Sequence, residues 1–139
     1  MNLCLYSEHK VEFFDVDSMN VMWHGNYVKI IESARCSFLD AIGYDYIQMK
    51  EDGFIFPIVK MHFKYISPAF FKDILCVKTT LKDCDVFLEF VYELSNAKTK
   101  QKIAVASTHQ VALATPSMTT QLSMPPKLLE AIKSYKEHK

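Results

Sequence analysis

The chain has 139 residues, half of them apolar and 13% aromatic, which is enough for one packed core and too little for two domains. Lysine plus arginine and aspartate plus glutamate balance at 16 each, so a broad basic surface for nucleic acid is not expected. No apolar run is long enough to cross a bilayer, and residues 1–10 lack the pattern of a signal peptide. We therefore expect a single cytoplasmic domain over residues 1–139, with no membrane span.

The cysteines and histidines show no spacing typical of a metal site. No two cysteines form a C-x-x-C pair, and no two histidines stand four residues apart. Reduced thiols and no metal are therefore expected, with Cys76 and Cys84 as packing residues in strand-like segments. The residues concerned are Cys4, Cys36, Cys76, Cys84, His9, His24, His62, His109 and His138.

The first third of the chain predicts a strand over 7–16, a turn over 17–20 and a helix over 26–42. A helical period of 3.6 residues is followed by the apolar positions Tyr27, Ile30, Ile31, Ala34, Phe38, Ala41 and Ile42. Asn26 is a suitable N-cap, and Gly43 marks the helix end.

The rest of the chain predicts four successive strands and a short amphipathic helix. The strands are expected over 58–66, over 73–82, from Val86 onward and over 102–115, with a hairpin loop at 96–100 and the helix starting near Pro125-Pro126. One strand, one long helix and four strands joined by short loops predict a two-layer α+β domain, in which a curved antiparallel sheet wraps around the helix. Its strand edges need cover, which favours an oligomer.

Two aspartates stand where the first strand is expected to end. If the strand continued through Asp15 and Asp17, its period of two would place both carboxylates on one side. The nearby helix start offers unpaired N–H groups that can hold the negative charge of a tetrahedral intermediate. A carboxylate there could attack a carbonyl or activate water, and Gly25 would let a ligand approach the backbone. By spacing alone, capping or surface roles are the simpler interpretation.

Several motifs change this interpretation, because the chain resembles the 4-hydroxybenzoyl-CoA thioesterase and YbgC-like acyl-CoA thioesterase family. The resemblance covers nearly the whole chain. The motifs that carry it are Phe14-Asp15-Val16-Asp17, Val21-Met22-Trp23-His24-Gly25-Asn26-Tyr27, Glu32-Ser33-Ala34-Arg35, Phe56-Pro57-Ile58-Val59, Tyr65-Ile66-Ser67-Pro68-Ala69 and Lys72-Asp73.

The resemblance implies a hotdog fold, with a curved five-stranded antiparallel sheet around one long central helix and a short C-terminal helix. It implies Asp17 as the catalytic carboxylate and His24, or its backbone N–H, beside the thioester carbonyl. The implied substrate-binding residues are Trp23, Gly25, Asn26 and Tyr27. The family builds its site at a dimer interface, so a homodimer or a dimer of dimers is implied.

Three further residues bear on this assignment. Asn20 stands near a position where the family usually has glycine, and asparagine tolerates the positive φ that such a turn requires. Asp15 is expected to have a structural hydrogen-bonding role. Glu32 is an alternative catalytic carboxylate, but it lies about 140° from the centre of the helix's apolar stripe. Arg35 follows it by three residues, so an exposed or interface ion pair is the simpler account.

The predicted activity is hydrolysis of an acyl-CoA or an acyl carrier protein thioester, with Asp17 as nucleophile or general base. No cofactor is expected beyond the coenzyme A of the substrate. The apolar pocket is expected from Trp23 and Tyr27, with Phe56, Phe63 and Tyr65 as further contributors. Lys60, Lys64, Lys82, Lys98 and Lys100 are candidates for the CoA phosphates. A hydroxyacyl-thioester dehydratase and a non-catalytic acyl-binding protein remain as alternatives.

Overall fold

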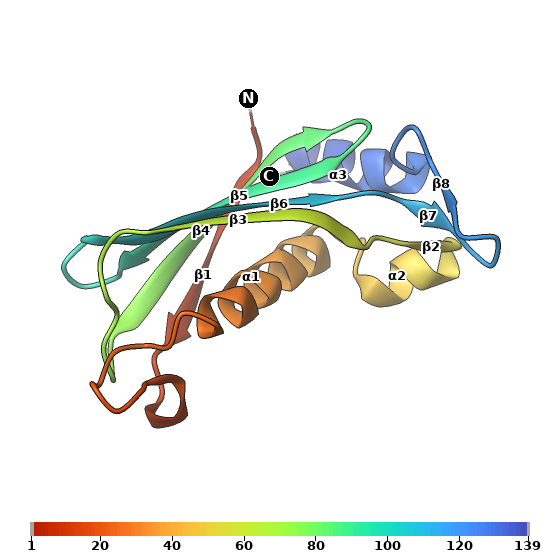
Figure 1. The fold of residues 1–139 in the computed structure, drawn as a ribbon. Helices are drawn as coiled ribbons and strands as arrows, with labels where there is room; N and C mark the ends of the chain where they lie inside the picture. Colours follow the sequence, from red (N-terminus) through yellow and green to blue (C-terminus); the bar gives the residue numbers. More distant parts are fainter. Residues whose placement is uncertain (1, 139) are drawn as a thin grey trace.

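The computed structural model describes residues 2–138. The long helix α1 (Asn26–Ile42) lies along one face of a curved antiparallel sheet (Figure 1). The sheet contains β1 (Cys4–Lys10), β3 (Ile58–Tyr65), β4 (Ile74–Cys84), β5 (Leu88–Asn96) and β6 (Lys102–Gln110). Their order is β1-β4-β5-β6-β3, so β1 and β3 form the two edges. The remaining elements are the 3-10 turn η1 (Phe13–Asp15), α2 (Tyr46–Glu51), α3 (Pro126–His138) and a small sheet of β2 (Phe54–Ile55), β7 (Leu113–Ala114) and β8 (Thr119–Thr120).

The core lies between α1 and the sheet, because both elements direct an apolar face inward. Leu88, Phe90 and Tyr92 alternate along β5 with partly exposed residues and are fully buried. Phe38 of α1 meets Phe90 edge to face, with ring centroids 4.9 Å apart. Burial of such aromatic side chains dominates the stability of a small core. The packing explains why a helix with an apolar stripe and strands with a period of two fold together.

The α+β arrangement and the bounds of α1 confirm the predictions, and Gly43 ends the helix with φ at 82°. The predicted first strand over 7–16 was wrong at its end, because β1 stops at Lys10. After that, Val11 donates its N–H to the carbonyl of Asp73 at 2.8 Å, and residues 13–15 form a 3-10 turn. The predicted last strand over 102–115 is interrupted after Gln110, and α3 is longer than the short helix expected.

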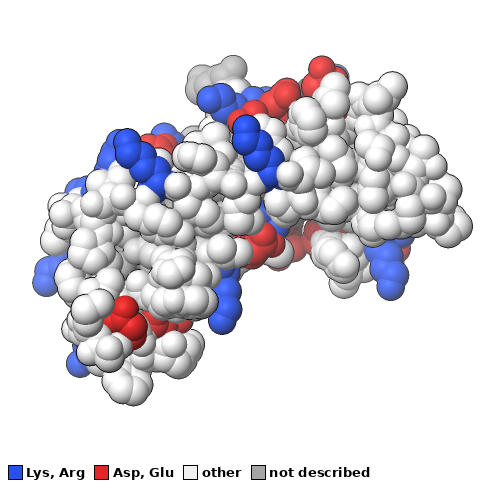
Figure 2. Space-filling model, viewed as in Figure 1, with Lys and Arg blue, Asp and Glu red and all other residues white. Residues whose placement is uncertain are grey.

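The face of the molecule drawn in Figure 2 carries charged side chains of both signs. Figure 2 shows lysine and arginine side chains interspersed with aspartate and glutamate over the viewed face. Between residues 2 and 138, no helix is long and apolar enough to cross a membrane.

The four cysteines differ in how readily they should react. Burial raises the pKa of the Cys84 thiol to about 12, and Asp83 and Asp85 raise it further, so its thiolate is scarce at neutral pH. Cys36 is exposed on α1. We expect iodoacetamide to modify Cys36 in the native protein and Cys84 only after unfolding, measured by peptide mass spectrometry. Equal labelling of both thiols in the native protein would contradict this packing.

Candidate active site

A cleft of about 350 Å³ opens between the turn that follows η1, the start of α1 and the chain that leaves β3. Met22 donates its N–H to the carbonyl of Ala69 at 2.8 Å, and Val21 forms an isolated antiparallel bridge with Phe70. These contacts join two segments that are distant in sequence. The cleft is lined by Asp17, Val21, Met22, Trp23, His24, Tyr27, Tyr65, Ile66, Ser67 and Pro68.

Asp17 lies in this cleft at the start of a tight backbone turn. Its Oδ1 accepts hydrogen bonds from the backbone N–H groups of Met19, at 2.8 Å, and Val21, at 3.3 Å. Asn20 adopts a φ of 64°, the left-handed conformation that its position near the family's glycine predicted. Within residues 2–138, no hydrogen bond engages Oδ2 of Asp17. The turn therefore fixes the carboxylate through one oxygen and leaves the other available to a ligand.

Asp15 lies outside the cleft lining and is buried. Its Oδ2 accepts from the N–H of Glu12 at 2.9 Å and lies 3.4 Å from Nε2 of His9. The prediction that a continuing strand would place both aspartates on one side was therefore wrong, because the 3-10 turn separates them. Asp15 is the last residue of η1, and Asp17 is the first residue of the turn that follows.

Asn26 connects this turn to the helix. Its Nδ2 donates to the backbone carbonyl of Asp15 at 2.7 Å, and that carbonyl also accepts from the N–H of Trp23 at 3.0 Å. The predicted N-cap role of Asn26 was wrong, because Gly25 occupies the cap position and Asn26 is already helical. Its buried amide instead holds the Asp15–Asp17 segment against the helix start.

We expect Asn26→Ala to lower the free energy of unfolding by about 1–2 kcal/mol, since the hydrogen bond of a buried side chain is lost. Urea unfolding would measure this change. The variant should also lose catalytic rate, because the Asp17 turn is no longer tied to the helix. Asn2→Ala, at an exposed position, is the matched control. An unchanged midpoint and rate in Asn26→Ala would show that the amide does not position the turn.

His24 and Trp23 form one rim of the cleft. Their ring centroids lie 5.2 Å apart, and the Tyr65 hydroxyl donates to the backbone carbonyl of His24 at 3.5 Å. The backbone N–H groups of His24 and Gly25 donate to no group within residues 2–138. Both donors at the start of α1 are therefore unpaired, and His24 lines the cleft, so its N–H is available to an oxygen atom bound there.

Gly25 makes room for the Trp23 ring, whereas the sequence was expected to use this glycine to let a ligand approach the backbone. A Cβ atom at Gly25 would lie 2.2 Å from the Trp23 ring, so the indole covers the glycine directly. The indole is half-exposed, so it can rotate away without unfolding the chain.

We expect Gly25→Ala to reduce kcat/KM about tenfold with little change in melting temperature, because the new methyl group displaces the wall of the cleft. Steady-state kinetics and thermal unfolding would measure the two effects. Gly53→Ala, at a glycine distant from the cleft, is the control. Its φ of 86° strains any residue with a side chain, so this variant should lower the melting temperature and leave kcat/KM unchanged. Wild-type kinetics in the Gly25→Ala variant would show that the Trp23 ring is not part of the site.

Tyr27 forms the buried floor beside Tyr65. Burial raises the pKa of Tyr27 to about 12, and the Tyr65 phenol raises it further, so its hydroxyl stays neutral at physiological pH. The two rings meet edge to face at 5.2 Å, and Tyr65 stacks on Phe63 at 5.7 Å. Tyr27 and Tyr65 give the cleft an apolar wall, as expected, whereas Phe63 stacks on Tyr65 without lining the cleft. Phe56 lies elsewhere, in a second cleft.

Glu32 does not line this cleft. It forms the predicted ion pair with Arg35, but the guanidinium is buried and not exposed. The sequence underestimated the burial of Arg35, because its long side chain reaches the hydroxyl of Tyr92 inside the sheet. Both residues line the second cleft.

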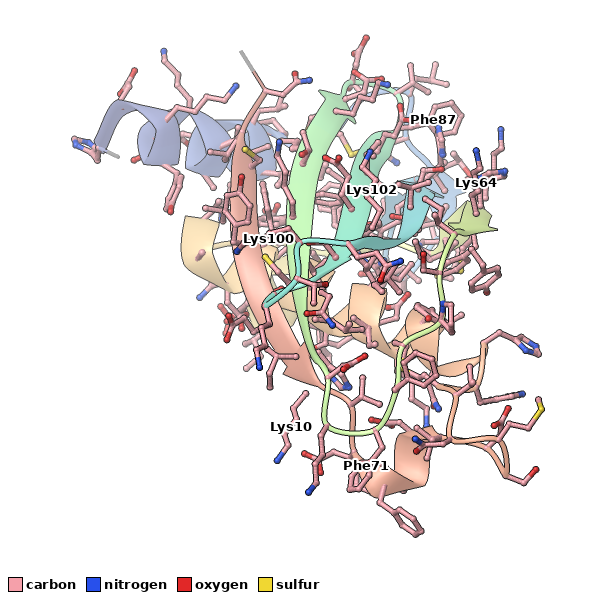
Figure 3. The ribbon with its side chains drawn as sticks, turned by 90° about the vertical axis from the view of Figure 1, so that its left-hand side faces the viewer. Lys10, Lys64, Phe71, Phe87, Lys100 and Lys102 are labelled. Atoms are coloured by element: carbon pink, nitrogen blue, oxygen red, sulfur yellow. The ribbon has the colours of Figure 1, made fainter. Side chains whose placement is uncertain are left out.

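The candidate phosphate ligands are not gathered into one cluster. Lys60 and Lys64 lie on β3, whereas Lys82 lies on β4, which two other strands separate from β3. In Figure 3, Lys64 and Lys100 also lie well apart. Within residues 2–138, no three histidine, cysteine or acidic side chains come together as a metal site would require.

The fold is that of the hotdog thioesterases. The family model of the thioesterase-like superfamily matches residues 11–132, so the chain belongs to that superfamily. A protein from Aquifex aeolicus, provisionally named an esterase, is 29% identical over 97 residues, which are 70% of this chain and 73% of that protein.

Solved structures show the same fold over almost the entire chain. A 1,4-dihydroxy-2-naphthoyl-CoA thioesterase from Synechocystis is 26% identical, with a TM-score of 0.82 and coverage of 94% of this chain and 96% of that one. A DHNA-CoA thioesterase from Staphylococcus aureus is 23% identical, with a TM-score of 0.84 and coverage of 96% and 91%. The predicted hotdog fold is thereby confirmed.

Proposed function

We propose that the protein hydrolyses acyl-CoA thioesters in the cleft that contains Asp17. The observation that carries this proposal is the pairing of a fixed carboxylate with free backbone donors. Asp17 is held through one oxygen, and His24, whose backbone N–H donates to no group within residues 2–138, lines the same cleft. Sequence and structural similarity to named acyl-CoA thioesterases supports the choice of substrate.

In the proposed reaction, the thioester carbonyl lies against the start of α1. The free N–H groups stabilise the oxyanion as the carbonyl carbon becomes tetrahedral. Asp17 either attacks this carbon or removes a proton from the water that attacks it. The C–S bond then breaks, the acyl group leaves as a carboxylic acid, and the CoA sulfur leaves as the thiol. A thioester is an activated acyl group, so the proposal needs no cofactor.

Thiol release from a panel of aliphatic and aromatic acyl-CoAs tests this proposal. We expect release that depends on the enzyme concentration and on the acyl group. Release from acyl carrier protein thioesters alone would move the substrate to a carrier protein. Addition of water to crotonyl-CoA without thiol release would favour the dehydratase. Tight binding of acyl-CoA without either reaction would leave an acyl-binding protein.

We propose further that the site is completed by a homodimer formed along β3. This edge strand has eight residues and carries the half-exposed side chains of Val59 and Tyr65. An unpaired edge of this length readily pairs with another strand. Antiparallel pairing of two β3 strands near their centre would bring the Tyr65 end of one strand beside the Ile58 end of the other. A dimer of such dimers is compatible with the same pairing.

A cytoplasmic location belongs to the same proposal. The four cysteines form no disulfide, which suits a reducing compartment where CoA thioesters are metabolised.

A further inference from the structure

Four phenylalanines gather at the end of the molecule where β1 leads into η1. Phe13 and Phe14 of η1 are 75% and 83% exposed, and Phe70 is 43% exposed. Phe71 is half-buried, and its ring meets that of Phe13 edge to face, with centroids 5.7 Å apart. These four residues are called the phenylalanine tip below. Single exposed apolar side chains are common, but a cluster of them marks a surface for a partner or a membrane.

The phenylalanine tip is built from two turns that backbone hydrogen bonds tie together. Lys72 donates its N–H to the carbonyl of Val11 at 3.0 Å, and Val11 donates its N–H to the carbonyl of Asp73 at 2.8 Å. The carboxylates of Asp15 and Asp73 each accept a backbone N–H at 2.9 Å, one in each turn. The backbone of the tip is therefore held in place, and its exposed rings project from a fixed support.

Exposed lysines surround the phenylalanine tip. Nζ of Lys72 lies 5.5 Å from the centroid of the Phe71 ring. The loop between β5 and β6 reaches the same end of the molecule, because Ala97 donates its N–H to the carbonyl of Ile74 at 2.8 Å. Lys10, the last residue of β1, stands opposite Ile74 in the sheet. Figure 3 shows Lys10 and Phe71 at the lower end of the molecule, with Lys100 above them. The exposed lysines at this end are Lys10, Lys72, Lys98 and Lys100.

The acidic residues between these lysines are less exposed. Glu12 and Asp73 are half-buried, and Asp15 is buried with its carboxylate 3.4 Å from Nε2 of His9. Glu8 on β1 is exposed. The surface at this end is therefore apolar at its centre and mainly cationic around it. Such a surface is complementary to an anionic partner that can also accept apolar rings.

We propose that the phenylalanine tip and its lysines dock the protein reversibly on an anionic lipid surface. The rings of Phe13 and Phe14 enter the boundary between headgroups and acyl chains, and the lysines bind the headgroup phosphates. A bilayer accepts projecting rings without a matching pocket, which favours lipid over a protein partner. This inference goes beyond the proposed thioester hydrolysis and does not depend on it.

Docking in this way places the cleft that contains Asp17 beside the lipid. Val21 lines that cleft and forms its antiparallel bridge with Phe70 of the tip. The half-exposed Trp23 lines the same cleft. An amphipathic thioester that partitions into the bilayer would therefore meet the cleft at the lipid surface.

Vesicle sedimentation tests the role of the rings. We expect the wild type to bind vesicles of equal parts phosphatidylcholine and phosphatidylglycerol, and to bind phosphatidylcholine alone about fivefold less. Phe13→Ser/Phe14→Ser should lower the partition coefficient on the anionic vesicles at least about fivefold, because the inserting rings are lost. Met118→Ser/Leu122→Ser is the matched control, at residues 51% and 84% exposed beside β8. β8 lies at the other end of the molecule from the turn between β1 and α1 (Figure 1), so this variant should bind like the wild type.

Charge reversal tests the role of the lysines. Lys10→Glu/Lys98→Glu should lower the partition coefficient on the anionic vesicles at least about fivefold, because the attraction to the headgroups is lost. Lys82→Glu/Lys133→Glu reverses two exposed lysines on β4 and α3 and should keep the wild-type value.

A second measurement reports insertion directly. Trp23 is the one tryptophan of the chain, so a Trp23→Phe background removes the native fluorescence. In this background, brominated acyl chains in the anionic vesicles should quench the fluorescence of Phe14→Trp. They should leave the fluorescence of Leu122→Trp unchanged.

Failure of the wild type to bind anionic vesicles would overturn the docking and leave the proposed hydrolysis untouched. Binding that survives Phe13→Ser/Phe14→Ser in a folded variant, or an unquenched tryptophan at position 14, would overturn the insertion of the tip. Light scattering on the same variants identifies another occupant. If the wild type ignores vesicles and Phe13→Ser/Phe14→Ser converts a dimer into a monomer, the tip is an interface between two copies of this chain.

Discussion

Replacing Asp17 with asparagine is expected to reduce kcat for acyl-CoA hydrolysis by about 10²-fold or more, with the fold intact. Asparagine has nearly the same size, and its amide oxygen can still accept from the N–H groups of Met19 and Val21. The turn should therefore persist while the negative charge is lost. Thiol-release kinetics, with circular dichroism and melting temperature as measures of folding, would establish the effect.

Two controls make this result specific to Asp17. Asp15→Asn should lower stability because its buried carboxylate closes η1, and any loss of rate should follow that instability. Glu32→Gln removes the partner of the buried Arg35 and should cost about 1–2 kcal/mol, less than a fully buried pair because Glu32 is partly exposed. Its effect on kcat should be small. If Glu32→Gln abolished turnover and Asp17→Asn retained it, the catalytic carboxylate would lie on the helix instead.

The sequence predicted the bounds of the long helix correctly but not the role of Asn26 at its start. The apolar positions of α1 follow one period, and Gly43 supplies the left-handed residue that ends it, so local signals were sufficient. At the start, Asn26 has a residue type that is common at an N-cap. Its amide instead binds the Asp15 carbonyl, a contact that depends on how η1 folds back. Propensity describes single residues and does not report such a tertiary contact.

The sequence predicted one wall of the site and only Tyr65 of the other wall. Asp17, Trp23, His24 and Tyr27 follow one another in the chain, and the structure brings them to one cleft. The other wall, Ile66 to Pro68, comes from the segment after β3. The residues that follow it, Ala69 and Phe70, form backbone contacts with Met22 and Val21. Of the motif at 65–69, only Tyr65 had been predicted as a contributor to the pocket.

The second cleft was missed although a signal for it is present. In β6, Ala104, Ala106, Thr108 and Gln110 share the inward period and become more polar toward the strand end. Thr108 binds the Tyr92 hydroxyl, and Gln110 keeps a free acceptor. Polar residues at the inward positions of a strand are costly unless they are paired, so they indicate either a hydrogen-bond network or a ligand site.

Single cysteines placed along β3 are expected to form a covalent homodimer at one position. A two-fold axis perpendicular to the sheet requires one residue of the strand to stand opposite its own copy, since facing residues of an antiparallel pair share a sheet face. Facing Cα atoms in such a pair lie about 4.5–5.5 Å apart, which a disulfide can bridge. In a Cys36→Ser background, we would replace each of residues 60–64 in turn and follow oxidation by non-reducing electrophoresis.

One of these variants should become almost entirely dimeric and its immediate neighbours far less so. Lys82→Cys, an exposed lysine on a strand paired on both sides, is the matched control and should stay monomeric on the gel. The oxidised dimer should retain thiol release, because a bridge at the axis preserves the proposed homodimer. Uniformly weak cross-linking at all five positions, equal to the control, would show that β3 does not pair with itself. The cleft with Asp17 would then have to bind the complete acyl group within one chain.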